Sequence, residues 1–64
     1  MGDYTKAVYD ILHEHGCTFV RRGKGDHNIY YSPLKGENIS VDGKIKFRQA
    51  ANATLQKAGI KKRL

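Results

Sequence analysis

The sequence predicts an α+β fold in which a helix, three antiparallel strands and a second helix follow one another along the chain. Apolar residues keep helical spacing near both ends, three short strand-like segments lie between them, and glycine-containing turns separate these segments. Two helices on one face of a three-stranded antiparallel sheet would bury both apolar sets. With 64 residues, the chain is expected to form one domain over residues 1–64.

The first helix is expected to follow Asp3, whose carboxylate can accept hydrogen bonds from the unpaired N–H groups of a first turn. Residues at intervals of three and four then form one helical face. They are Tyr4, Ala7, Val8, Ile11, Leu12 and His15. Gly16 is expected to end this helix, because glycine adopts the left-handed conformation at low cost.

Three strands are predicted from their aromatic and β-branched residues and from alternation of apolar and polar side chains. They are Cys17–Arg22, His27–Ser32 and Glu37–Asp42, joined by turns at Gly23–Asp26 and Pro33–Gly36. Consecutive strand residues point to opposite faces. Of Tyr30 and Tyr31, one is therefore expected to pack in the core, and the other either stacks on a base or stays half-exposed.

The second helix is predicted to run from Phe47 to Ala58. Its expected apolar face comprises Phe47, Ala50, Ala51, Thr54, Leu55 and Ala58, with Thr54 as the one polar member. Gly59 is the expected C-terminal cap. The cations Lys57, Lys61, Lys62 and Arg63 follow at the negative end of the helix dipole, where positive charge is favoured.

The charge balance favours a polyanionic partner. Twelve lysines and arginines against six acidic residues give a net charge of +6, which indicates nucleic acid ahead of a membrane surface. A basic solvated surface is the alternative, and Lys44, Lys46 and Arg48 can likewise hold RNA phosphates or form a solvated rim. No apolar run reaches the length of a membrane span and no signal-peptide core is visible, so a cytoplasmic protein is expected.

The single cysteine, Cys17, leaves no intramolecular disulfide and is too few for a zinc site built from cysteines. A small buried apolar side chain is expected there rather than a nucleophile. His13 and His15 do not share a helical face, so they are not expected to form a metal pair. The sequence predicts neither a metal nor another cofactor.

The segment that leads into the second strand contains residue types suited to proton transfer and phosphate binding. It places His27 after Arg21, Arg22, Lys24 and Gly25. An imidazole can transfer protons near neutral pH, and the cations and turn N–H groups can bind a phosphate and stabilise its transition state. In RNA, removal of the 2′-hydroxyl proton lets that oxygen attack the adjacent phosphorus. We therefore predict metal-independent RNA cleavage with His27 as general acid or base, giving a 2′,3′-cyclic phosphate and a 5′-hydroxyl.

Each part of this segment also has a purely structural interpretation. Gly23 and Gly25 are typical of a hairpin turn, and arginines can protect an edge strand from aggregation. His27 shares strand parity with Ile29 and Tyr31, so a buried core histidine is the alternative to a catalytic one.

Taken in order, these segments resemble the HicA toxins, small mRNA interferases of toxin–antitoxin pairs. The resemblance lies in Glu14-His15-Gly16, Gly25-Asp26-His27-Asn28-Ile29-Tyr30, Ser32-Pro33-Leu34-Lys35-Gly36, Ile39-Ser40-Val41, Gly43-Lys44-Ile45-Lys46 and Leu55-Gln56-Lys57-Ala58-Gly59-Ile60. It implies a fold like that of a double-stranded-RNA-binding domain and mRNA cleavage with His27 as the catalytic residue. It also implies a HicB-type antitoxin protein that covers the active site.

Two segments depart from the pattern of that family. Asp26 stands where the family usually has serine or another small polar residue, and a carboxylate there can favour the imidazolium form of His27 and repel the phosphate. Phe47-Arg48-Gln49 stands where the family often has Pro-Gly-Thr. The alternatives to a toxin ribonuclease are a non-catalytic double-stranded-RNA-binding module and a degenerate toxin that only binds its antitoxin.

Overall fold

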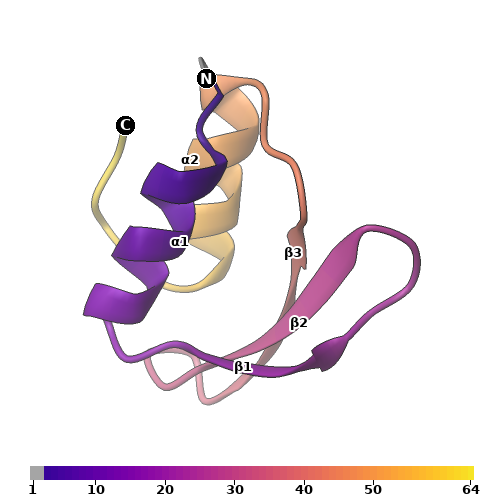
Figure 1. Ribbon diagram of the computed structural model, residues 1–64. Coiled ribbons are helices and arrows are strands. Elements are labelled where there is room, and N and C mark those ends of the chain that lie inside the picture. The colour runs from indigo at the N-terminus through magenta and orange to yellow at the C-terminus, as the bar shows by residue number, and fades with distance from the viewer. Residues whose placement is uncertain (1–2) are drawn as a thin grey trace.

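The computed structural model describes residues 3–64, and its element order confirms the predicted helix–strand–strand–strand–helix sequence (Figure 1). The elements are α1 Thr5–Glu14, β1 Thr18–Arg22, β2 His27–Ser32, β3 Glu37–Asp42 and α2 Arg48–Lys57. The second and third strands have the predicted bounds, and the first begins one residue later than predicted. Within the described chain, no helix combines the length and apolarity that a membrane crossing requires.

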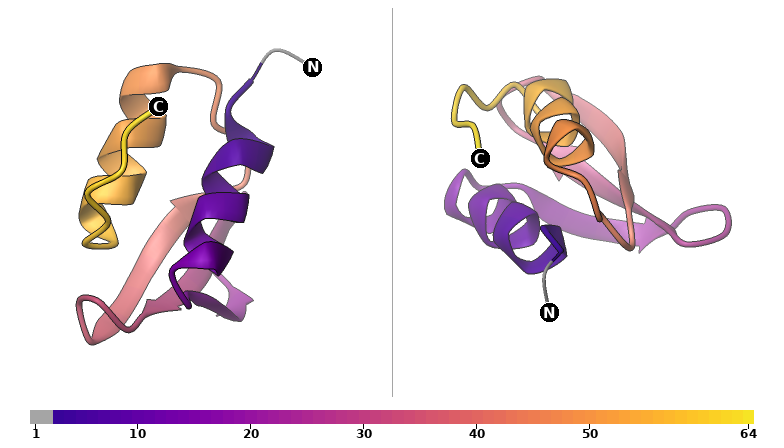
Figure 2. Two further views of the ribbon diagram at one scale, coloured as in Figure 1. Left: turned by 90° about the vertical axis from the view of Figure 1, so that its left-hand side faces the viewer. Right: turned by 90° about the horizontal axis from the view of Figure 1, so that it is seen from above.

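The three strands form one antiparallel sheet in the order β1-β2-β3. Both helices lie side by side on the same side of this sheet (Figure 2). The other side of the sheet carries no helix, and we call it the open face. The β1–β2 turn projects beyond the helices at one end of the molecule (Figure 1).

The alternation of β2 assigns its residues to these two faces. Tyr30 and Ser32 are buried toward the helices, and Asn28, which has the same parity, donates a hydrogen bond to the Tyr9 hydroxyl of α1. His27 and Tyr31 therefore belong to the open face, where Tyr31 is 40% exposed. Of the two tyrosines, Tyr30 is thus the core residue.

The β1–β2 pairing contains one irregularity. Phe19 pairs with Tyr30 and Arg21 pairs with Ile29, so Val20 is an extra residue in a β-bulge. All five residues of β1 are exposed. This strand covers the core much less than β2 and β3 do, although Phe19 meets the Tyr30 ring edge-on with 5.8 Å between ring centroids.

The core lies between the helices and the sheet. Its buried apolar residues are Val8, Ile11, Leu12, Cys17, Tyr30, Ile39, Val41, Ile45, Ala51, Leu55, Ala58 and Ile60. The predicted burial of Cys17 is confirmed. The prediction for Phe47 was wrong, because this residue has extended backbone angles just before α2 and is 70% exposed.

The helix ends agree in part with the prediction. Gly16 and Gly59 both have positive φ (83° and 81°), as expected for residues that end helices. At the start of α1, Asp3 accepts a hydrogen bond from the backbone of Thr5 (3.2 Å), but Tyr4 occupies the N-cap position. The hydrogen bond from Asp3 therefore stabilises the entry into the helix without a side-chain cap at Tyr4.

Ser32 joins the sheet to the end of α2. Its side chain is fully buried, and its hydroxyl donates a 2.6 Å hydrogen bond to the carbonyl of Ala58. We expect Ser32→Ala to lower the free energy of unfolding by about 1–3 kcal/mol, because a buried carbonyl loses its partner. Urea titration measures this change. Ser40→Ala, at a half-buried site on β3, is the control, and an equal effect of both substitutions would contradict the expectation.

Candidate active site

His27 begins β2 at the surface. It lies directly opposite Asp42, the last residue of β3, and the imidazole Nε2 is 2.7 Å from Asp42 Oδ1. The other ring nitrogen, Nδ1, lies 3.2 Å from the backbone carbonyl of Lys24 in the turn. Both side chains of the pair are about half exposed (48% and 51%). The ring is therefore accessible from solvent, which removes the interpretation of His27 as a buried core histidine.

The two contacts of the ring restrict its hydrogen bonding. Both ring nitrogens face oxygen acceptors, whereas a neutral imidazole has only one N–H to donate. The imidazolium can donate to Asp42 and to Lys24 at once. A neutral ring that donates to Asp42 leaves the Nδ1 lone pair beside the Lys24 carbonyl, where an incoming hydroxyl would be a better partner. The ring can thus both hold a proton and exchange one through Nδ1.

Asp42 is itself held in place from the helix side of the sheet. The Tyr9 hydroxyl of α1 donates a 2.8 Å hydrogen bond to the backbone carbonyl of Asp42 and accepts one of 3.0 Å from the Asn28 side chain. Tyr9 also packs edge-to-face on Tyr30, with ring centroids 5.4 Å apart. The first helix therefore fixes the end of β3 relative to the start of β2, where His27 lies.

An open pocket of about 190 Å³ lies on the helix side of the sheet, near the His27–Asp42 pair. It is lined by Arg22, Asp26, Asn28, Gly43 and Lys44. Two cations from different parts of the chain thus meet beside one carboxylate and one carboxamide. This set can bind a phosphate group, although Asp26 opposes the positive charge of Arg22 and Lys44.

The lack of a side chain at Gly43 allows the backbone after β3 to approach the β1–β2 turn closely. A methyl group at its Cα would overlap the backbone carbonyl oxygen of Asp26. The chain leaving β3 therefore passes directly against the β1–β2 turn. This close approach brings Lys44 beside Arg22 and holds Asp42 next to the strand that carries His27.

The remaining predicted phosphate-binding residues are distributed around the turn and the start of α2. Arg21 pairs with Ile29 and so shares the open face with His27. Lys24 and Gly25 belong to the turn itself, where Gly25 has a φ of 64°. Lys46 and Arg48 are exposed near the start of α2 and do not line the pocket that contains Arg22 and Lys44.

Tyr30 and the other two histidines lie away from this pair. Burial raises the pKa of Tyr30, with a smaller contribution from Tyr9, so the Tyr30 hydroxyl keeps its proton at neutral pH. It lies 3.4 Å from Nε2 of His13, and Nδ1 of His15 lies 2.9 Å from the Ile11 carbonyl. Among residues 3–64, no three or more His, Cys, Asp or Glu side chains come together as metal ligands.

The sequence pattern predicts a role for His27 but gives no local sign of Asp42. The strand register would have revealed it, since a hairpin closed by the turn at residues 33–36 pairs Ser32 with Glu37 and hence His27 with Asp42.

Comparison of the chain with protein-family models, with curated proteins and with solved structures found no match. The assignment of a function therefore depends on the geometry of these residues.

Proposed function

We propose that this protein is an endoribonuclease that cleaves RNA through attack of the ribose 2′-hydroxyl, with His27 as the proton-transfer group. The observation that supports this proposal best is the half-exposed His27 ring, held at 2.7 Å by Asp42 beside a turn that carries cations. A carboxylate that orients an imidazole at an open surface is a common arrangement for general acid–base chemistry.

In the proposed reaction, the neutral His27 ring takes the proton of a 2′-hydroxyl group. The 2′-oxygen then bonds to the adjacent phosphorus, and the bond from phosphorus to the 5′-oxygen breaks. The protonated ring returns its proton to that leaving oxygen, which yields a 2′,3′-cyclic phosphate and a 5′-hydroxyl. Asp42 acts as a positioning residue, because it holds Nε2 and directs Nδ1 toward the turn.

The cations have two roles in this proposal. Arg21, on the open face with His27, and Lys24, in the adjacent turn, stabilise the negative charge that develops on the phosphate under attack. Arg22 and Lys44 bind a neighbouring phosphate in the pocket on the helix side. Asp26 lowers the affinity of that pocket for RNA through charge repulsion.

We further propose that the protein is the toxin of a toxin–antitoxin pair, as the resemblance to the HicA family implies. The expected antitoxin is a HicB-type protein that covers the turn and His27. The helix–strand–strand–strand–helix order and the position of the histidine at the start of the second strand agree with this proposal. Its partner is tested separately from its chemistry, by co-purification with the product of a neighbouring gene.

The decisive experiment is incubation of a labelled RNA oligonucleotide with the protein in EDTA. We expect cleavage products that end in a 2′,3′-cyclic phosphate, and we expect a single 2′-deoxy substitution at the cleaved nucleotide to prevent cleavage there. Binding of RNA without cleavage would instead support the double-stranded-RNA-binding module. An inactive protein that gains activity on Asp26→Ser would be a degenerate toxin.

Asp42→Asn is expected to lower kcat by at least about tenfold, because the amide cannot supply the charge that stabilises the imidazolium. RNA affinity is expected not to fall, since the substitution removes a negative charge from the RNA-binding surface. Multiple-turnover kinetics of cleavage and filter binding of a non-cleavable 2′-O-methyl RNA measure the two quantities. Asp10→Asn, which removes a carboxylate paired with Lys6 on α1, is the control. An unchanged kcat in Asp42→Asn would show that the charge of this carboxylate does not support proton transfer by His27.

A further inference from the structure

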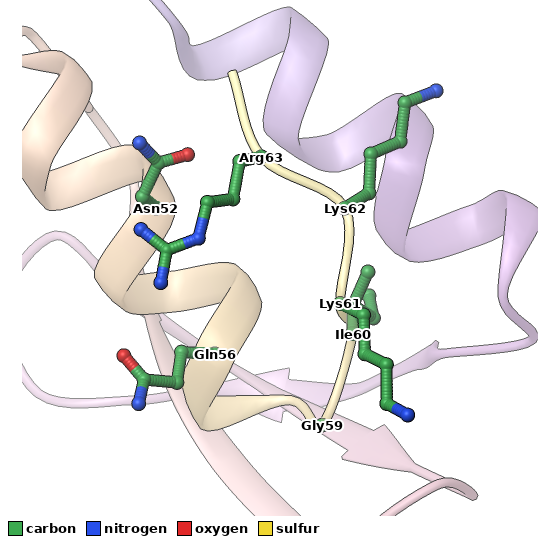
Figure 3. Close-up of a pocket in the computed structure, with 7 residues that line it drawn as sticks. All are labelled: Asn52, Gln56, Gly59, Ile60, Lys61, Lys62 and Arg63. Atoms are coloured by element: carbon green, nitrogen blue, oxygen red, sulfur yellow. The ribbon is translucent and has the colours of Figure 1, made fainter.

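The segment after α2, residues 59–64, runs back along that helix (Figures 2 and 3). The side chain of Asn52 in α2 accepts a 2.7 Å hydrogen bond from the backbone N–H of Leu64 and donates one of 3.3 Å to its carbonyl. At the other end, Ile60 is buried and Gly59 closes the helix. The residues between these anchors are therefore tied to α2 at both ends.

These intervening residues are Lys61, Lys62 and Arg63, and all three are exposed. Within residues 3–64, none of them has a carboxylate at ion-pair distance, since the ion pairs there are those of Lys6 and His27. Three adjacent positive charges on an anchored segment repel one another, so an anion that binds there removes an unfavourable interaction.

A cavity of about 320 Å³ lies between this segment and α2. Figure 3 shows the Arg63 guanidinium extending toward Asn52 and Gln56, whereas the side chains of Lys61 and Lys62 point away from α2. A guanidinium and a carboxamide can together donate hydrogen bonds to phosphate oxygens. Lys61 and Lys62 could then bind the phosphates that neighbour the one held by Arg63.

We propose that this basic segment, Lys61–Arg63 with Gln56, binds the phosphodiester backbone of RNA at a second site, remote from His27. The segment and the β1–β2 turn lie at opposite ends of the molecule (Figures 1 and 2). RNA is favoured over an acidic protein because the lining residues include two lysines and no aromatic side chain, whereas the cores of protein interfaces are depleted in lysine and enriched in aromatic residues. The identity of the ligand as RNA rests on the proposed ribonuclease function.

The test measures the affinity of a 2′-O-methyl RNA, which cannot be cleaved, as a function of salt concentration. Loss of two phosphate contacts in K62Q/R63Q is expected to weaken binding and to lower the magnitude of the negative slope of log K (the association constant) against log salt by about 1.4, at roughly 0.7 per contact for a single strand. The charge-conserving K62R/R63K is expected to keep the slope. Lys6→Gln, at an exposed lysine of α1 that does not line this cavity, is expected to change the slope little.

A second variant tests whether the anchoring itself matters. Asn52→Ala keeps every positive charge but removes both hydrogen bonds to Leu64. It is expected to weaken RNA binding by roughly 2- to 10-fold, because the released side chains must be ordered on binding. Circular dichroism verifies that each variant keeps the fold of the unchanged protein.

The outcomes separate this inference from the proposed function. Normal RNA cleavage together with unchanged binding by K62Q/R63Q would overturn the second site and leave the ribonuclease intact. Unchanged RNA binding together with lost binding of poly-L-glutamate would also overturn it and would assign the segment to an acidic protein. If RNA binds and K62Q/R63Q shows the lower slope while no cleavage occurs, the second site stands and the ribonuclease fails.

Discussion

His27→Ala is expected to lower the rate constant of RNA cleavage by about 10²- to 10⁴-fold, the range for loss of a general acid or base. The half-exposed ring has one nitrogen beside Asp42 and the other beside the Lys24 carbonyl. Alanine removes the group that carries the proton from the 2′-oxygen to the leaving 5′-oxygen. Single-turnover kinetics with a labelled RNA measure this loss.

The fold is expected to tolerate this substitution. The His27 side chain is about half exposed and leaves no core cavity, and the backbone bonds between His27 and the turn residues Gly23 and Lys24 do not involve the ring. Stability is therefore expected to change by less than about 1 kcal/mol, as for most surface positions. His13→Ala is the control, since this exposed ring lies against Tyr30, with ring centroids 5.8 Å apart. Equal cleavage by His27→Ala and the unchanged protein would contradict the proposed mechanism.

Gly43→Ala is expected to lower the free energy of unfolding by about 1–3 kcal/mol, the usual range for overpacking, and to weaken cleavage as well. The new methyl group would overlap the carbonyl oxygen of Asp26, and both partners are backbone, so no side-chain rotation relieves the clash. The chain after β3 must then move away from the turn. That movement separates Asp42 from His27, so the pair loses its 2.7 Å contact.

Gly25→Ala provides the matched comparison for this second prediction. Gly25 lies in the same turn with a φ of 64°, but a methyl group there meets no atom within 4 Å. Its cost is limited to the left-handed conformation, about 1–2 kcal/mol. Urea titration gives both stabilities, and NMR chemical shifts of the His27 ring report whether Asp42 stays in contact. A His27 signal displaced by Gly25→Ala but not by Gly43→Ala would contradict the role given to Gly43.

Much of the fold could be predicted from local patterns, because those patterns reflect burial directly. The three- and four-residue spacing in the first helix and the alternation of Ile39 and Val41 both gave correct core residues. The faces of β2 were harder to predict, since Tyr30 and Tyr31 lie on opposite faces and both are apolar enough to be core. The buried Ser32 settles the orientation, and its burial depends on the distant carbonyl of Ala58.

The candidate site could be predicted only where one residue carries the chemistry by itself. His27 stood out because its type and its cationic neighbours are adjacent in sequence. Asp42 and Tyr9 escaped notice because their roles arise from strand register and from helix packing, which bring together residues far apart along the chain. The exposure of Phe47 was missed for a similar reason, since helical spacing does not reveal where a helix begins.

The extra residue in β1 decides which arginine serves which side of the sheet. With Val20 as the bulge, Arg21 pairs with Ile29 and Arg22 pairs with Asn28. In a regular ladder continuing from the pairing of Phe19 with Tyr30, each arginine would move to the opposite surface. If Val20 paired with Ile29 instead, Arg21 would lie opposite Asn28 at the pocket and Arg22 would lie opposite His27 on the open face. The one extra residue of β1 thus determines which guanidinium group lies on each face of the sheet.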